Sequence, residues 1–225
     1  MQNQPPSPSD ASISQCKSLT EEIDNRMRRL WMPGKRETLI AESYDAAFTC
    51  KEAGAIDLAK TNFQRAISLA SGLSERNSRH TTSLGIAAAC HNHLGLLELD
   101  LEHLEASIPH FDSAIELRKL LRTRVAIERE NQVYLGGALC NRAIATSPTD
   151  PKSARAYFEA SLHELQQPKR TCECSYWDEP RNSWWCEQLE AMGDAMNLPW
   201  VSLAPLFIDS AMEGLKRLDE SSLTS

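Results

Sequence analysis

The chain has 225 residues, a net charge of −7, 41% hydrophobic and 24% charged residues, a balance typical of a soluble globular protein. The acidic charge argues against a nucleic-acid partner bound through bulk electrostatics, and no apolar run reaches the roughly 20 residues that span a bilayer. We therefore expect no nucleic-acid partner and no membrane partner.

The first residues predict a tail and one short helix. Residues 1–17 contain three prolines and four serines and lack apolar periodicity, so we expect them to be disordered. A short helix is predicted over residues 18–32, with Thr20 as its N-cap, acidic residues at its start and arginines near its end. The Pro-Gly pair at 33–34 ends this helix.

A helical repeat domain is expected over residues 37–219, because one small-large-small spacing recurs along it. The large residues are separated by 48, 47 and 50 positions, and each has a small residue four positions before it and three after it. A lone helical hairpin cannot bury its apolar stripe, so the period predicts an all-α stack of antiparallel hairpins. The four sets are Ala59, Phe63 and Ala66; Ser107, Phe111 and Ala114; Ala154, Phe158 and Ser161; and Ala204, Ile208 and Ala211.

Turn residues divide this domain into four hairpins. The first hairpin turns at Gly54, and the second has Pro109 early in its second helix, within the first turn, where a missing N–H is tolerable. In the third hairpin Asp150 is the expected N-cap and Pro151 the first helical residue. An irregular connection, 166–183, precedes the last hairpin, which is expected over residues 184–218.

These repeats resemble the tetratricopeptide repeat. Leu94-Gly95 on the first helix of the second hairpin, with Phe111 and Ala114 on its second helix, match that family's pattern. The run from Val133 to Asn141 is similar to helices of long-period bacterial arrays, which often accompany signalling kinases. The resemblance implies an α-α superhelix of about four hairpins, with longer helices or connections than the family's usual period of about 34 residues requires.

The resemblance also implies a function, namely binding of a protein or peptide partner by a scaffold or adaptor that has no catalysis and no cofactor. In that family the partner lies in a concave groove lined by the first helix of each hairpin. The alternative for the same residues is packing in the core between repeats, and the sequence leaves both open. Mapped onto this chain, the groove residues are Tyr44, Phe48, Lys51, Asn92, Leu96, Leu99, Cys140 and Ile144.

Cysteine usage predicts the compartment and a second candidate function. Seven cysteines are an odd number that does not fit a disulfide framework, and no secretory signal opens the chain, so we expect a cytoplasmic protein with reduced thiols. The alternative function is a regulatory domain with a metal or redox site on a cysteine cluster, although its spacing is not that of paired zinc knuckles. The cluster comprises Cys172, Cys174 and Cys186, with His163 as a fourth ligand.

Two further clusters have more than one interpretation. Four of the five tryptophans lie in the last third of the chain and predict either a cap on the open end of the array or a binding hot spot. The basic residues Arg118, Lys119, Arg122, Arg124 and Arg129 are interpreted as a solvated helix C-terminus, with an anion patch as the alternative. No phosphate loop or nucleophile elbow is present, and we predict no enzyme.

Overall fold

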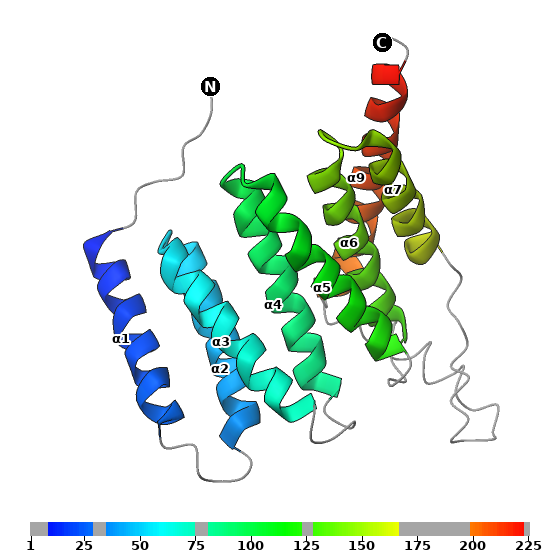
Figure 1. Ribbon diagram of the computed structural model, residues 1–225. Coiled ribbons are helices and arrows are strands. Elements are labelled where there is room, and N and C mark those ends of the chain that lie inside the picture. The colour runs from blue at the N-terminus through cyan, green and yellow to red at the C-terminus, as the bar shows by residue number, and fades with distance from the viewer. Residues whose placement is uncertain (1–8, 29–34, 75–80, 123–127, 167–198, 223–225) are drawn as a thin grey trace, which may run out of the picture. The chain divides into compact units, whose positions relative to one another are not determined.

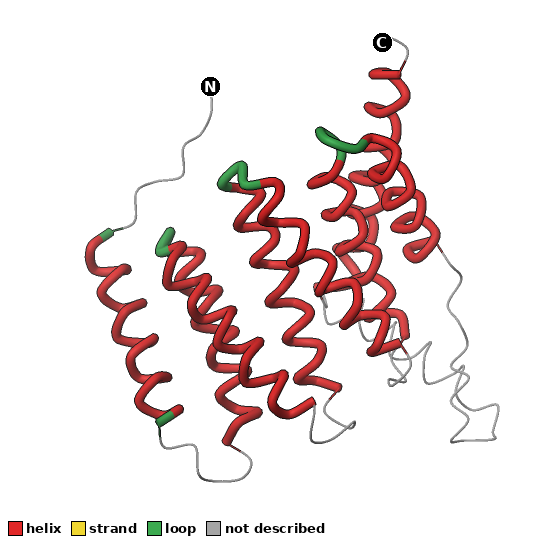
Figure 2. Tube along the Cα trace, in the orientation of Figure 1, coloured by secondary structure: helices red, strands yellow, loops and turns green. Residues whose placement is uncertain are grey.

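The computed structural model describes residues 9–28, 35–74, 81–122, 128–166 and 199–222, which form helices and the short turns beside them (Figures 1 and 2). Adjacent helices pack in hairpin-like pairs, α2 with α3 and α6 with α7. The predicted all-α array of helical hairpins is therefore confirmed for this part of the chain. The helices are α1 (Asp10–Met27), α2 (Lys35–Glu52), α3 (Ile56–Ser74), α4 (Thr81–Asp100), α5 (Leu104–Arg122), α6 (Glu128–Thr146), α7 (Pro151–Gln166) and α9 (Pro199–Ser222).

The chain divides into two compact units, residues 1–97 and 98–225. The predicted repeat domain over 37–219 spans this division, which falls inside α4, after Leu97. Each unit has buried clusters of its own, around Phe63 in the first and around Phe158 in the second. A sequence period specifies how each hairpin closes, but it does not specify how evenly contacts continue from one hairpin to the next.

The first helix begins well before the predicted position. Ser9 is the N-cap of α1, since its hydroxyl accepts a hydrogen bond from the amide of Ser12 at 3.2 Å. Residues 10–17 are therefore helical, and the predictions of disorder through residue 17 and of Thr20 as the cap are wrong. Thr20 is buried in mid-helix with Cys16 and Ile23. This i, i+4, i+7 stripe gives α1 a face that packs on α2 and α3.

The core of the first unit forms around Phe63 on α3. Its ring is fully buried, as are Ala59 one turn before it and Ala66 three residues after it. The small side chains let α3 approach its neighbours closely, and the phenylalanine fills the remaining space. Residues from all four helices contribute, including Cys16 from α1, Ala47 and Cys50 from α2, and Cys90, Leu94 and Leu97 from α4.

The turn between α2 and α3 is at Gly54, as predicted. This glycine has φ of 73°, in the left-handed region that side chains disfavour. Its amide donates to the carbonyl of Lys51 at 3.0 Å, and the amide of Ala55 donates to the carbonyl of Cys50 at 2.8 Å. These bonds satisfy the last carbonyl groups of α2 in the manner of a glycine C-cap.

The second unit repeats the same packing signature. Phe111 on α5 and Phe158 on α7 are buried, and so are Ala114, Ala154 and Ala211. The predicted role of these positions as the cores of their hairpins is therefore confirmed. The first helix of the predicted last hairpin and the irregular connection before it lie outside the described residues, whereas α9 supplies the second helix.

Two helix starts of the second unit test the sequence predictions. Asp150 caps α7, because its carboxylate accepts a hydrogen bond from the amide of Ser153 at 3.0 Å, and Pro151 is the first helical residue. Pro109 is misplaced, since α5 begins at Leu104 and the proline is its sixth residue. It therefore lies beyond the first turn, and the carbonyl of Glu105 loses its usual intrahelical donor.

Glycines close the contacts among α6, α7 and α9. A Cβ atom on Gly136 would lie 2.5 Å from Cγ of Leu165 on α7, and one on Gly137 would lie 2.5 Å from the ring of Phe207 on α9. Gly214 on α9 has the same relationship to the ring of Phe158 on α7. In each pair of these three helices, a large side chain of one helix packs directly against a glycine of the other.

Candidate functional site

Four ring-bearing residues of the first unit form one cluster, here called the aromatic cluster: Tyr44 and Phe48 on α2, Phe63 on α3 and His93 on α4. Tyr44 and Phe48 are four residues apart and therefore share a face of α2, with their ring centroids 4.9 Å apart in an edge-to-face contact. The ring of Phe48 meets Phe63 at 5.7 Å and His93 at 4.6 Å, both edge-to-face. Such arrangements are the preferred geometry of aromatic pairs.

His93 is held neutral inside this cluster. Burial of the imidazole, together with the positive charge of Lys51, lowers the pKa of His93 to about 4, because both disfavour the protonated ring. Its Nδ1 atom is buried and has no hydrogen-bond partner among the described residues. At neutral pH the imidazole therefore behaves as a flat, weakly polar ring that packs with its aromatic neighbours.

The five predicted groove residues of the first unit are half-buried, and three of them are part of the aromatic cluster or act on it. Tyr44 and Phe48 belong to it, and the charge of Lys51 acts on His93. Asn92 and Leu96 flank His93 on α4 and are half-buried as well. These five residues, Tyr44, Phe48, Lys51, Asn92 and Leu96, are called the α2–α4 face.

Three other predicted groove residues belong to the second unit. Leu99 lies near the end of α4 and is half-buried, and Ile144 on α6 is 41% exposed. Cys140 is fully buried against Ala143, Phe158 and Ala211, so its assignment to a groove is wrong. Cys140 and Ile144 are one helical turn apart, but Cys140 lies in the core and Ile144 is exposed to solvent.

Tyr44 and Phe48 lie at the boundary between the core and the surface of the first unit. Each ring packs against the buried cluster around Phe63 on one side and remains partly exposed on the other. His93 was not among the predicted site residues. It lies three positions before Leu96, on the same side of α4, and this spacing was the available signal.

The described basic residues around Arg118 differ in their exposure. Arg118 is only 8% exposed, and its guanidinium lies over the ring of Tyr134, 4.6 Å from the centroid. Arg122 is ion-paired with Glu164 on α7, whereas Lys119 is exposed. The interpretation as a solvated helix C-terminus is therefore wrong for Arg118, which joins α5 to α6. Arg124 and the side chain of Arg129 lie outside the described part of the chain.

The metal hypothesis falls mostly on residues that are not described. Cys172, Cys174 and Cys186 lie outside the described residues, and so do Trp177, Trp184, Trp185 and the side chain of Trp200. His163 is exposed on α7. Among the described residues, no group of three or more potential metal ligands is close enough to hold an ion, and no helix has the length and apolar character to cross a bilayer.

Comparison with known proteins gives no assignment. No family model matches the chain, and no curated protein is a significant match. The similarity to the tetratricopeptide repeat therefore rests on the residues themselves and on the hairpins they form.

Proposed function

We propose that the chain is a scaffold or adaptor that binds a protein or peptide on the α2–α4 face, without catalysis. The observation that carries this proposal is the pair of half-buried rings Tyr44 and Phe48, 4.9 Å apart, beside Lys51. Partly exposed aromatic side chains next to a polar group are typical anchors of a protein interface.

The packing of Tyr44 and Phe48 lowers the entropic cost of binding a partner. Phe48 is held edge-on by Phe63 and His93, and Tyr44 is held by Phe48. A partner that packs on them therefore loses little free energy in ordering side chains, because the core has already restricted their rotamers. Lys51 adds hydrogen-bond donors at the edge of the apolar surface.

The resemblance to the tetratricopeptide repeat supports the same surface. It assigns the groove to the first helix of each hairpin, and α2 and α4 are the first helices of the first two hairpins. Four cysteines, Cys16, Cys50, Cys90 and Cys140, are free and buried, which favours the cytoplasm as the place of binding.

The test is a comparison of captured partners. The immobilised chain, the variant Tyr44→Ala/Leu96→Glu and the single variant Leu96→Glu are incubated with a cell lysate, and the captured proteins are quantified by mass spectrometry. The strongest captured protein is then purified and titrated against each variant. We expect both variants to lose about tenfold or more in affinity, because anchor residues each contribute more than about 1 kcal/mol.

The matched control is Leu206→Glu. Leu206 is a 59% exposed leucine of α9 in the second unit, so this change introduces the same charge on a different surface. Circular dichroism establishes that each variant is folded. Equal affinity of wild type and the α2–α4 variants for every captured partner would exclude this face as the binding site.

A further inference from the structure

Two cysteines belong to the core of the first unit. Cys16 on α1 and Cys50 on α2 are both buried and belong to the same cluster. The side chain of Cys16 is also among the groups that raise the pKa of Cys50. The pair thus joins α1, which precedes the predicted repeats, to the first helix of the first hairpin.

A polar network fixes the position of this pair. The amide nitrogen of Asn62 on α3 donates to the hydroxyl of Thr20 at 2.9 Å and approaches Sγ of Cys50 at 3.8 Å. The hydroxyl of Thr20 in turn donates to the carbonyl of Cys16 at 2.8 Å. One asparagine therefore sets the register of α1 against α2 and α3 at the level of the two sulfurs.

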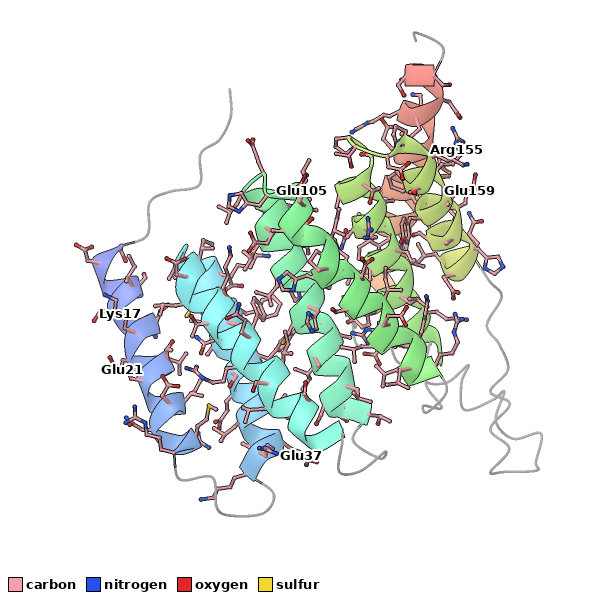
Figure 3. All side chains as sticks on the ribbon, in the orientation of Figure 1. Lys17, Glu21, Glu37, Glu105, Arg155 and Glu159 are labelled. Atoms are coloured by element: carbon pink, nitrogen blue, oxygen red, sulfur yellow. The ribbon has the colours of Figure 1, made fainter. Side chains whose placement is uncertain are left out.

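The network continues to the surface through an ion pair. Arg65 on α3 donates to the side-chain oxygen of Asn62 and, at 2.5 Å, to a carboxylate oxygen of Asp24 on α1. On the opposite, exposed side of α1 lie Lys17 and Glu21 (Figure 3). The side of α1 that faces the hairpin thus carries sulfur, hydroxyl and carboxylate groups together with few large apolar residues.

Two observations bear on the reactivity of the pair. Burial and the neighbouring Cys16 raise the pKa of Cys50 to about 11, so the thiol is protonated and shielded while α1 is docked. The buried side of α1 consists of Cys16, Thr20 and Ile23, a small apolar contact that favours local opening of this helix. Opening would expose both thiols together.

We propose that Cys16 and Cys50 are a modification site at which a peroxide forms a reversible disulfide that fixes α1 to α2. Both cysteines already lie in one buried cluster, on helices that the Asn62–Thr20 network joins. In a reducing compartment the thiol form is the resting state, and the disulfide forms when the peroxide concentration rises.

The chemistry balances with the peroxide as the only oxidant. One thiol releases its proton and the thiolate attacks a peroxide oxygen. The O–O bond breaks, a sulfenic acid forms, and the leaving hydroxide (for hydrogen peroxide) takes up the released proton to become water. The second thiolate attacks the sulfenic sulfur, and hydroxide leaves and is protonated to a second water. Two thiols lose two electrons and two protons, which the peroxide takes up. A dithiol reductant restores both thiols by two successive exchanges.

Two other buried thiols provide matched controls. Burial also raises the pKa of Cys90 and that of Cys140, the latter to about 12. Neither thiol has a second cysteine among the groups that act on it within the described residues. They test whether burial alone is sufficient for oxidation or whether a neighbouring sulfur is required.

The first experiment maps the bond in the full chain. Reduced protein is treated with hydrogen peroxide, unfolded, alkylated at its free thiols and digested with trypsin, which places Cys16 in the peptide 1–17 and Cys50 in the peptide 37–51. We expect these two peptides joined, lighter by two hydrogen atoms than their sum, in wild type and Cys90→Ser. A dithiol reductant or the change Cys16→Ser should abolish the product.

Other products would overturn the proposal. These are full alkylation of Cys16 and Cys50 after peroxide, oxidation of either to a sulfinic acid alone, or disulfides from them to other cysteines. The second experiment measures hydrogen exchange of the α1 amides. In the oxidised form we expect exchange about ten- to a hundredfold slower, because the cross-link removes the open ensemble. Unchanged exchange in cross-linked protein would show that the bond does not fix α1.

Discussion

The imidazole of His93 lies nearly parallel to the ring of Phe63, with 5.5 Å between the ring centroids and 14° between the ring planes. The first helix of one hairpin is thereby stacked on the second helix of the preceding one. The contact depends on the protonation state of the imidazole, since a charged ring at this buried position would have to leave its aromatic neighbours or lose its hydration.

Stability should therefore fall in mild acid. The pKa of His93 is lowered to about 4 in the folded chain, against about 6.5 when unfolded. Between these values the unfolded state binds the proton and the folded state does not, so the free energy of unfolding decreases as pH falls from 6.5 to 4. The decrease attributable to His93 is on the order of 3 kcal/mol. It is measured by urea denaturation across this pH range.

The matched variants for this pH dependence are His93→Gln and His103→Gln. The side chain of His103 is 61% exposed, so its replacement is the control for removing an imidazole from the surface. His93→Gln should flatten the slope, whatever its effect at pH 7. The same slope in both variants would assign the acid sensitivity to other groups.

Truncation of Phe63 should create a cavity in the first unit. We expect Phe63→Ala to lower the free energy of unfolding by about 3–5 kcal/mol, because the ring is fully buried between Ala59 and Ala66. The control is Leu206→Ala, an exposed position at which a change within about 0.5 kcal/mol is expected. Chemical denaturation measures both, and a loss below about 1 kcal/mol for Phe63→Ala would contradict the packing.

Asn62 is expected to be sensitive although it is polar. Asn62→Ala leaves the Thr20 hydroxyl without a donor and Arg65 without one acceptor, and it should cost about 1–3 kcal/mol because buried polar groups lose their partners. Asn25→Ala, at an exposed position of α1, is the control. Denaturation curves that coincide for the two variants would show that the network adds nothing to stability.

Gly137→Ala should destabilise the second unit. The added methyl group would overlap the ring of Phe207, and overpacking of this kind costs about 1–3 kcal/mol, more than the gain in helix propensity of about 1 kcal/mol. The double variant Gly137→Ala/Phe207→Leu should recover part of the loss. Thermal melting of the single and double variants tests this, and an additive loss in the double variant would refute the steric origin of the effect.

The sequence predicts the hairpins better than it predicts their edges. The recurring spacing identifies Phe63, Phe111 and Phe158 as core residues, because small and large side chains at a fixed helical period lie on the face that packs against a neighbouring helix. The start of α1 is not found in this way, since its buried stripe contains Cys16 and Thr20 and has little apolar contrast with its surroundings. Local composition predicts a tail there, and contacts with α2 and α3 determine a helix.

The candidate site is predictable only in part, for a related reason. Tyr44 and Phe48 are identified by their place on the first helix of a hairpin. His93 and Arg118 depend on residues distant in sequence, because the ring of Phe63 and that of Tyr134 determine how they are buried. A titratable side chain in a helical pattern looks exposed until its neighbours from other helices are known.

The glycines of the second unit restrict how its sequence can diverge. Gly136, Gly137 and Gly214 each leave room for one particular large side chain from another helix, so a change at either member of a pair is harmful until the other changes too. Divergent descendants of this chain should therefore alter positions 137 and 207 together, and 214 with 158. Paired replacements at these helix contacts would identify this bundle in sequences that are otherwise no longer similar to this one.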